Sequence, residues 1–241
     1  MTFARLFGIA AICVLPVSGG AQNLTEDQVR DLVLDTIRAN PQIVVEALQI
    51  LEQEQQEAQA AAAQVALADQ RALLENDPNA PVIGNPDGDV TVVEFFDYNC
   101  PYCRSAKTEL DGLLSADSNV RVVLREWPVL GEGSVFAARA ALASRQQGKY
   151  EEFHNALMTM QGRAEEQSVI RVAQSVGLDI DQLRRDMEAP EVAEHLQLSS
   201  GLSRSLGFTG TPSFVIGQNL APGLIRADQM QRLVAAARTA D

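Results

Sequence analysis

An apolar run leads directly into two cysteines in the stretch Val92-Val93-Glu94-Phe95-Phe96-Asp97-Tyr98-Asn99-Cys100-Pro101-Tyr102-Cys103. The run predicts a buried strand, and the amphipathic pattern of residues 104–114 predicts a helix that starts at the cysteines. A thiolate at a helix N-terminus faces unpaired backbone N–H groups and the positive end of the helix dipole. Both lower its pKa below the ~8.5 of a free cysteine, and the thiolate is the form that attacks disulfides. The stretch therefore predicts a redox-active dithiol.

Glu94 interrupts the apolar run six positions before Cys100. Burying a carboxylate costs several kcal/mol unless it is paired or protonated. One interpretation is that this strand lies at a sheet edge and turns Glu94 to solvent. The other is a general base beneath the dithiol, with a pKa raised by desolvation, that exchanges a proton with Cys103.

Length and composition indicate a globular protein with one or two domains. The chain has 241 residues, of which 46% are hydrophobic and 21% charged, which is ordinary for a folded protein. The formal net charge is −13, whereas non-specific binding to nucleic acid or to anionic membranes requires a basic surface. No nucleic-acid partner is therefore expected.

Residues 1–21 have the pattern of a secretory signal peptide. Arg5 supplies the positive n-region, residues 6–15 form an apolar h-region, and Gly19 and Ala21 suit the −3 and −1 positions of a cleavage site. The alternative is a membrane anchor, but the apolar run is shorter than the ~20 residues of a spanning helix. No later segment is apolar enough to span a bilayer, so we expect a soluble mature protein.

The cysteine content changes if this leader is removed. Cys13 lies in the h-region, which leaves only Cys100 and Cys103 in a compartment that permits disulfides. A disulfide between cysteines three positions apart closes a very small loop and contributes little as a structural cross-link. The pair therefore predicts a chemical role, with the disulfide itself as the redox group and no other cofactor or metal.

Residues 22–78 are expected to form helices. Thr25 and Gln28 make a capping-box pattern, and Asn40 with Pro41 marks a stop and a restart. The sequence then continues without Gly or Pro to about residue 75 and is rich in good helix formers. We expect one long helix there, preceded by a short one.

The long helix carries a narrow apolar seam. Its positions repeat every seven residues, and a companion series is small except for Glu54. The first series is Val44, Leu51, Ala58, Val65 and Ala72, and the second is Ala47, Glu54, Ala61 and Ala68. This period is compatible with Ala-rich coiled-coil packing, so we favour a homo-oligomer formed through residues 22–78. An exposed stalk packed against its own domain is the alternative.

Turn-forming residues at 76–81 and 84–88 precede the main domain. A second strand is expected at residues 120–127, parallel to the first. Residues 134–207 are helical in pattern, punctuated by Gly and Pro, and indicate an inserted helical block. We expect Trp127 to be a packing residue, and His154 and His195 to be structural or solvated rather than catalytic.

Thr211 and Pro212 stand at the mouth of a further strand within residues 207–217. Proline cannot sit inside a central strand ladder, so it belongs at the start of the strand or in a special conformation. A cis bond before Pro212 would leave the backbone groups of Thr211 free to pair with an extended substrate. Residues 227–238 predict a closing helix.

These motifs in combination resemble the DsbA family of thioredoxin-fold thiol–disulfide oxidoreductases. The resemblance runs from about Val82 to the C-terminus, and the helical N-terminal extension is most similar to ScsC-type members. It implies an α/β thioredoxin-like domain at residues 82–241 with a helical insertion at about 134–207, preceded by the stalk. It also implies a periplasmic location, protein substrates with cysteines, and a membrane redox partner.

Roles follow from the resemblance, residue by residue. Cys100 would be the attacking thiolate and Cys103 the resolving thiol. Pro101 and Tyr102 would tune the redox potential. The resemblance makes Glu94 the buried acid and Thr211–Pro212 the cis-proline substrate platform.

Two departures favour isomerase over oxidase activity. The dipeptide between the cysteines is Pro-Tyr rather than the Pro-His of DsbA itself, which removes a stabiliser of the Cys100 thiolate and predicts a less oxidising couple. Thr211 before the proline also resembles the isomerase members. The sequence thus predicts a disulfide oxidoreductase that leans to isomerisation. The alternatives are a dithiol oxidase, a Cu(I)-binding envelope protein that uses the two thiolates, and a structural protein with a degenerate thioredoxin fold.

Overall fold

The computed structural model describes residues 24–240. The predicted signal peptide, with Cys13, lies outside this range. The chain divides into two units, one that ends at Glu54 and one that begins at Gln55. Among the described residues, no helix is long and apolar enough to cross a membrane.

The first unit is helical and has little core of its own. Helix α1, Glu26–Ala39, starts on the predicted capping box between Thr25 and Gln28 and has no buried residue. Helix α2, Gln42–Asn76, begins in this unit and continues into the second. Many apolar side chains of residues 24–54 are exposed, among them Val29, Leu32, Val33, Ile43, Val44, Leu48 and Leu51.

A five-stranded mixed sheet forms the centre of the second unit, in the order β1-β3-β2-β4-β5. Strands β2 and β3 are parallel, and the other neighbouring pairs are antiparallel. The strands are β1 Val82–Gly84, β2 Val90–Phe96, β3 Val120–Glu126, β4 Ser213–Ile216 and β5 Asn219–Pro222. The expected strand, helix and parallel strand around the cysteines are therefore present.

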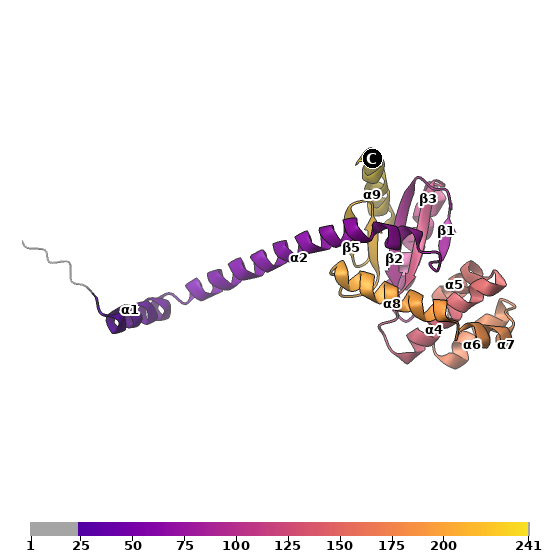
Figure 1. The fold of residues 1–241 in the computed structure, drawn as a ribbon, viewed down its shortest axis with the longest axis horizontal. Coiled ribbons are helices and arrows are strands. Elements are labelled where there is room, and N and C mark those ends of the chain that lie inside the picture. The colour runs from indigo at the N-terminus through magenta and orange to yellow at the C-terminus, as the bar shows by residue number, and fades with distance from the viewer. Residues whose placement is uncertain (1–23, 241) are drawn as a thin grey trace, which may run out of the picture. The chain divides into compact units, whose positions relative to one another are not determined.

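Helices surround this sheet. Helix α3, Pro101–Ala116, follows β2 and carries Cys103, and α9, Ala227–Ala240, closes the chain. The helices between β3 and β4 form the expected insertion, and α4 to α7 gather at one end of the strands (Figure 1). They are α4 Glu132–Ala143, α5 Tyr150–Thr159, α6 Glu166–Ser175, α7 Ile180–Asp186 and α8 Pro190–Ser205, with a short 3-10 turn at Ser144–Gln147.

Alternation of side chains gives the sheet two different buried faces. The redox face carries Val92, Glu94 and Phe96 of β2 and Val122, Leu124 and Glu126 of β3, and its core includes α3, α5 and α9. The α2 face carries Val93, Phe95, Val123 and Arg125, and its core includes α8 and the end of α2. Trp127 packs edge-on against Phe95 on the α2 face, as expected of a packing residue.

The second half of α2 is part of this unit. Leu67 and Leu74 are fully buried, and the Arg71 guanidinium donates to the Gly217 carbonyl over 3.1 Å. Val65, a member of the predicted seam, is 62% exposed. The side of α2 that packs on the sheet is therefore not the side that carries the seven-residue seam. The seam remains exposed along the helix.

Candidate active site

The dithiol lies at the junction of β2 and α3. Cys100 caps the helix N-terminus and Pro101 begins its first turn. Both cysteines are free thiols in this structure. Cys103 is fully buried, Cys100 retains 4% exposure, and Tyr102 is 63% exposed. Of the two sulfur-bearing residues only Cys100 retains any exposure, beside an exposed aromatic ring.

The two thiols have opposite acidities. The pKa of Cys100 is lowered to about 6, first by a hydrogen bond from the Cys103 thiol, then by the Thr211 side chain and the backbone N–H groups of Cys103 and Tyr102, against the effect of burial. Burial raises the pKa of Cys103 far above its usual range, and Cys100 and Glu94 add to that increase. Cys100 is thus the more acidic thiol, and Cys103 is the one that holds its proton at neutral pH.

Thr211, which directly precedes Pro212, lies against the Cys100 sulfur. The Thr211–Pro212 peptide bond is cis, and the Cys100 thiol donates to the Thr211 carbonyl oxygen over 3.2 Å. Pro212 immediately precedes β4, which pairs with β2. The structure thus brings this predicted substrate platform to the dithiol across 111 positions of sequence.

Glu94 is buried in the middle of the sheet, on the redox face. Strand β2 lies between β3 and β4, and Glu94 is 1% exposed, so the edge-strand interpretation is wrong. Its Oε1 has no hydrogen-bond partner. Burial raises the pKa of Glu94 to about 8, and the positive charge of Lys107 partly opposes that rise. A carboxyl with this pKa can take up or release a proton near neutral pH.

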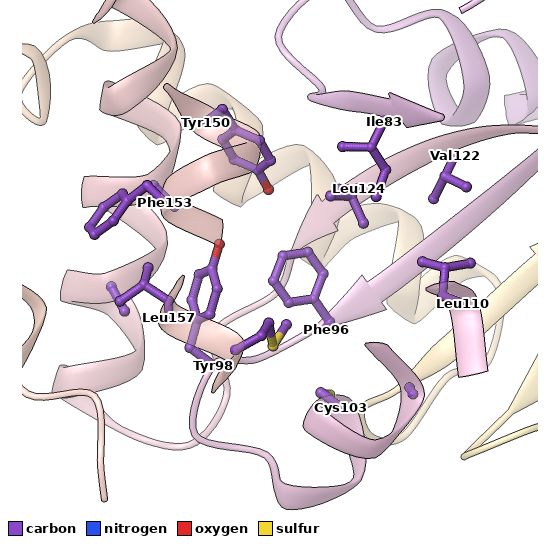
Figure 2. Packing of buried hydrophobic residues seen from close by; sticks show 14 of the residues in the cluster. Ile83, Phe96, Tyr98, Cys103, Leu110, Val122, Leu124, Tyr150, Phe153 and Leu157 are labelled. Carbon is purple, nitrogen blue, oxygen red and sulfur yellow. The ribbon is translucent and has the colours of Figure 1, made fainter. Parts of the chain in front are cut away.

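A second buried carboxyl, Glu126, was not anticipated from the sequence. Its Oε1 accepts hydrogen bonds from the Tyr98 hydroxyl over 3.0 Å and the Tyr150 hydroxyl over 2.8 Å. The Tyr98 hydroxyl also lies 3.1 Å from Nδ1 of His154. Figure 2 shows the two tyrosine rings with their hydroxyls directed into the same space beside Phe96. In the sequence, the only indication was that the strand predicted at residues 120–127 ends in polar residues. That indication did not identify the partners of Glu126.

Burial keeps this network neutral. It raises the pKa of Glu126 well above its ordinary value, although both tyrosine hydrogen bonds oppose the rise. It also lowers the pKa of His154 to about 3. His154 and His195 are both buried, which agrees with the structural role expected for them. Because Tyr98 precedes Cys100 by two residues, the network also holds the loop that carries the nucleophile.

Polar contacts fasten the same loop to the insertion. The Asp97 carboxylate accepts from the backbone N–H groups of Val129 and Leu130 over 2.8 and 2.9 Å. The Asp97 backbone N–H donates to the Cys103 sulfur over 3.5 Å. One turn into α3, the Arg104 guanidinium donates to the carbonyls of Met160 and Gly162. The insertion thereby fixes the position of both cysteines.

Residues 24–240 contain no group of three or more His, Cys, Asp or Glu side chains that could hold a metal ion.

Two protein families match the chain. Residues 91–235 match the DSBA-like thioredoxin domain. Residues 26–58 match the copper resistance protein ScsC N-terminal domain. The first match covers most of the second unit, including the dithiol and the Thr211–Pro212 platform.

Solved structures agree with these matches. A thioredoxin-like oxidoreductase from Silicibacter pomeroyi DSS-3 is 64% identical, with a TM-score of 0.70, over 71% of this chain and 99% of that one. Proteus mirabilis ScsC in a transitional conformation is 31% identical, with a TM-score of 0.67, over 90% of this chain and 98% of that one. The Na⁺/H⁺ antiporter NhaA 3 of Salinispora tropica is 29% identical over 60% of this chain, but the match spans only 22% of the antiporter.

The match to the thioredoxin domain extends over more than half of the chain, and it agrees with the sheet, the dithiol and the helical insertion described above. The chain belongs to the DSBA-like thioredoxin family of thiol–disulfide oxidoreductases.

Proposed function

We propose that this protein is a periplasmic thiol–disulfide oxidoreductase that leans to disulfide isomerisation and acts on protein substrates through a mixed disulfide at Cys100. The opposite acidities of the two cysteines carry the proposal. A membrane redox partner would reset the pair. Periplasmic location rests on the predicted leader, and cleavage after Ala21 would give a mature protein that begins at Gln22, which mass spectrometry of the exported chain would reveal.

The site supports a two-step exchange. In the first step the Cys100 thiolate attacks a substrate disulfide while the substrate backbone pairs beside Thr211–Pro212. In the second step Cys103 attacks the mixed disulfide and passes its proton to Glu94. Pro101 and Tyr102, at the exposed helix N-terminus, would set the redox potential of the couple.

Isomerisation requires a mixed disulfide that survives long enough for the substrate to rearrange. Cys103 is fully buried, and its raised pKa keeps it protonated. A protonated thiol does not attack disulfides. The second step is therefore slow until a base accepts the proton, and the substrate gains time to exchange partners within the complex.

Refolding of scrambled ribonuclease and reduction of insulin test this function together. Cys100→Ser should abolish both activities because it removes the nucleophile. Cys103→Ser should abolish insulin reduction, retain part of the isomerisation and accumulate the mixed disulfide. Full activity of Cys100→Ser would contradict the whole proposal. Loss of isomerisation in Cys103→Ser, with oxidation of reduced substrates intact in the wild type, would instead indicate a dithiol oxidase.

We further propose that residues 22–78 join several chains into one particle. Exposed apolar side chains in residues 24–54 and the free seam of α2 support this proposal. Substituting Val44 and Leu51 with Lys should reduce the particle to a monomer by light scattering and lower isomerisation. Substituting the exposed Gln55 and Gln56 with Lys is the matched control. Truncation is better placed at Gln55 than near Pro81, because Leu67 and Leu74 are buried in the second unit.

A Cu(I) site at the dithiol is the less favoured candidate, although the family matched by residues 26–58 is named for copper resistance. Cu(I) selects soft thiolate ligands. Cys103 is fully buried, so Cu(I) would have to reach it past Cys100, and binding would release its proton. A titration with Cu(I) against a competing chelator would check this point.

A further inference from the structure

Lys107 stands one helical turn after Cys103 on α3, and it is paired with a second charge on the same helix. Its Nζ lies 2.6 Å from both carboxylate oxygens of Asp111. The Lys107 side chain is only 12% exposed, whereas Asp111 is 53% exposed. Arg104, on the same side of α3, reaches the Met160 carbonyl at the end of α5. Because it follows Cys103 by four residues, Lys107 shares the side of α3 that carries Cys103 and packs on the redox face, with Asp111 toward solvent.

Glu94 is the buried acid that this pair affects. The groups that act on the Glu94 charge from α3 and its N-terminus are Lys107, Asp111 and Cys100, and Glu94 in turn acts on Cys103. From β3 and α5 the interacting groups are Glu126 and Tyr150. The residue opposite Glu94 in β4 is Phe214, which carries no charge. Lys107 is the cation in this set, and it also acts on His154 of α5.

We propose that Lys107 and Asp111 together set how readily Glu94 accepts the proton of Cys103, so that this ion pair on α3 determines the pH range in which the mixed disulfide is resolved. Lys107 is then a positioning residue that acts through Glu94. The inference rests on the proton-acceptor role proposed above for Glu94.

The step that the pair controls balances within the site and the substrate. The Cys103 S–H bond breaks, its proton goes to the Glu94 carboxylate, and the sulfur electron pair forms the Cys100–Cys103 bond. The bond between Cys100 and the substrate sulfur breaks, and its electron pair leaves with the substrate as a thiolate. The two enzyme cysteines are oxidised, the substrate disulfide is reduced, and Glu94 ends as a neutral acid.

The two charges of the pair act on Glu94 with opposite signs. Lys107 favours the carboxylate and lowers the pKa of Glu94, whereas Asp111 raises it. Lys107→Gln should therefore shift the pH midpoint of resolution upward. Asp111→Asn leaves the Lys107 charge unopposed, and it should shift the midpoint downward. A purely structural role of the Lys107–Asp111 contact predicts similar changes for both variants, because each one breaks the same contact.

The test measures the resolving step directly in the full chain, with Cys13→Ser in every variant. Reduced protein is mixed with oxidised glutathione across about pH 5 to 10, quenched with acid, and separated into mixed disulfide and internal disulfide. We expect the midpoint of Lys107→Gln to rise by about one pH unit, with about tenfold slower resolution at pH 7. Asp111→Asn should lower the midpoint by about half a unit, and Lys107→Arg should restore the wild-type value. Asp228→Asn, which breaks an exposed ion pair with Arg232, should change nothing.

Glu94→Gln separates failure of the inference from failure of the proposed function. It should abolish the rise of the resolution rate with pH (the pH step), because no carboxyl remains to accept the proton. A wild-type profile in Glu94→Gln would overturn the role of Glu94 and the inference with it. If Glu94→Gln loses the step while Lys107→Gln and Asp111→Asn keep the wild-type midpoint, or shift it in the same direction, only the inference is overturned.

Discussion

Two neighbouring residues of β3, Arg125 and Glu126, show how the two faces of the sheet treat buried charge. On the α2 face the Arg125 guanidinium is fully buried and pairs with the Asp77 carboxylate over 2.6 Å. It also donates to the carbonyls of Leu73 and Leu74 at the end of α2. On the redox face Glu126 is equally buried, but its partners are the hydroxyls of Tyr98 and Tyr150.

The two arrangements have different consequences. Arg125 keeps its charge because an ion pair and two carbonyls compensate for the loss of water. Its contacts join α2 to the sheet, which is a structural function. The carboxyls of the redox face, Glu94 and Glu126, are held neutral by protonation. A group that is buried through a bound proton can release that proton, and this makes the redox face suitable for chemistry.

The largest expected effect breaks the ion pair on the α2 face. Asp77→Ala leaves the Arg125 charge buried without a carboxylate, so it should lower the free energy of unfolding by about 3–5 kcal/mol. Urea unfolding at neutral pH would measure this loss, with Asp228→Ala at an exposed pair as the control. The alkylation rate of Cys100 in the folded protein should not change. A shift in the pKa of Cys100 would show that the two faces are not independent.

The second largest expected effect is the dependence of stability on pH that Glu94, on the redox face, causes above about pH 5. Glu94 has a pKa of about 8 in the folded protein and about 4.3 when unfolded. Between these values the unfolded chain releases a proton that the folded protein keeps, so stability falls as pH rises, by about 1.4 kcal/mol per pH unit. Relative to the wild type, Glu94→Gln should change the slope by this amount, measured by urea unfolding between about pH 5 and 8. Glu126, whose pKa is also raised, keeps its own contribution in the variant. An unchanged slope would contradict a protonated Glu94.

The loss of stability at acid pH should come from both faces of the sheet. Burial lowers the pKa of His154 and of His195 to about 3, against about 6.5 in the unfolded chain. The unfolded chain therefore binds protons first as pH falls below about 6.5, and each histidine should cost up to about 1.4 kcal/mol per pH unit. His154→Gln on the redox face and His195→Gln, beside Asp77, should each change the slope between about pH 6.5 and 4.5 by up to about 1.4 kcal/mol per pH unit relative to the wild type, whose slope also includes the opposite contribution of Glu94. A slope that only one variant reduces would assign acid instability to one face.

The sequence predicted the elements of the site that lie close together in the chain. The strand, the dithiol and the helix start are consecutive, and the apolar context of Glu94 already indicated burial. The Thr211–Pro212 platform was predictable because proline at a strand mouth restricts the backbone. The environment of Glu126 was not predictable, because its partner Tyr150 comes from α5, and tertiary packing sets the approach of that helix to β3.

The long helix α2 is a second case in which tertiary contacts could not be predicted from the sequence. A run of helix-forming residues without Gly or Pro correctly predicted the long helix, and the seven-residue period described an apolar seam on it. It could not indicate that Leu67 and Leu74, outside that seam, are buried against the α2 face of the sheet. Periodicity reports which residues share a side of a helix, and the partner of that side depends on residues such as Arg125 that are distant in the sequence.

The smallest expected effect tests whether Glu126 is neutral. Tyr150→Phe removes one of two donors to Oε1 of Glu126 and leaves Tyr98 in place. If Glu126 is a protonated acid, the variant loses a hydrogen bond between neutral groups, and the free energy of unfolding should fall by about 1 kcal/mol. The pKa of Cys100, followed by thiolate absorbance, should move by less than about half a unit. Tyr102→Phe, at a largely exposed ring, is the matched control for the unfolding measurement. A loss of about 2–3 kcal/mol is typical of a hydrogen bond to a charged group, and it would indicate an ionised Glu126, because a buried carboxylate depends on every donor it has.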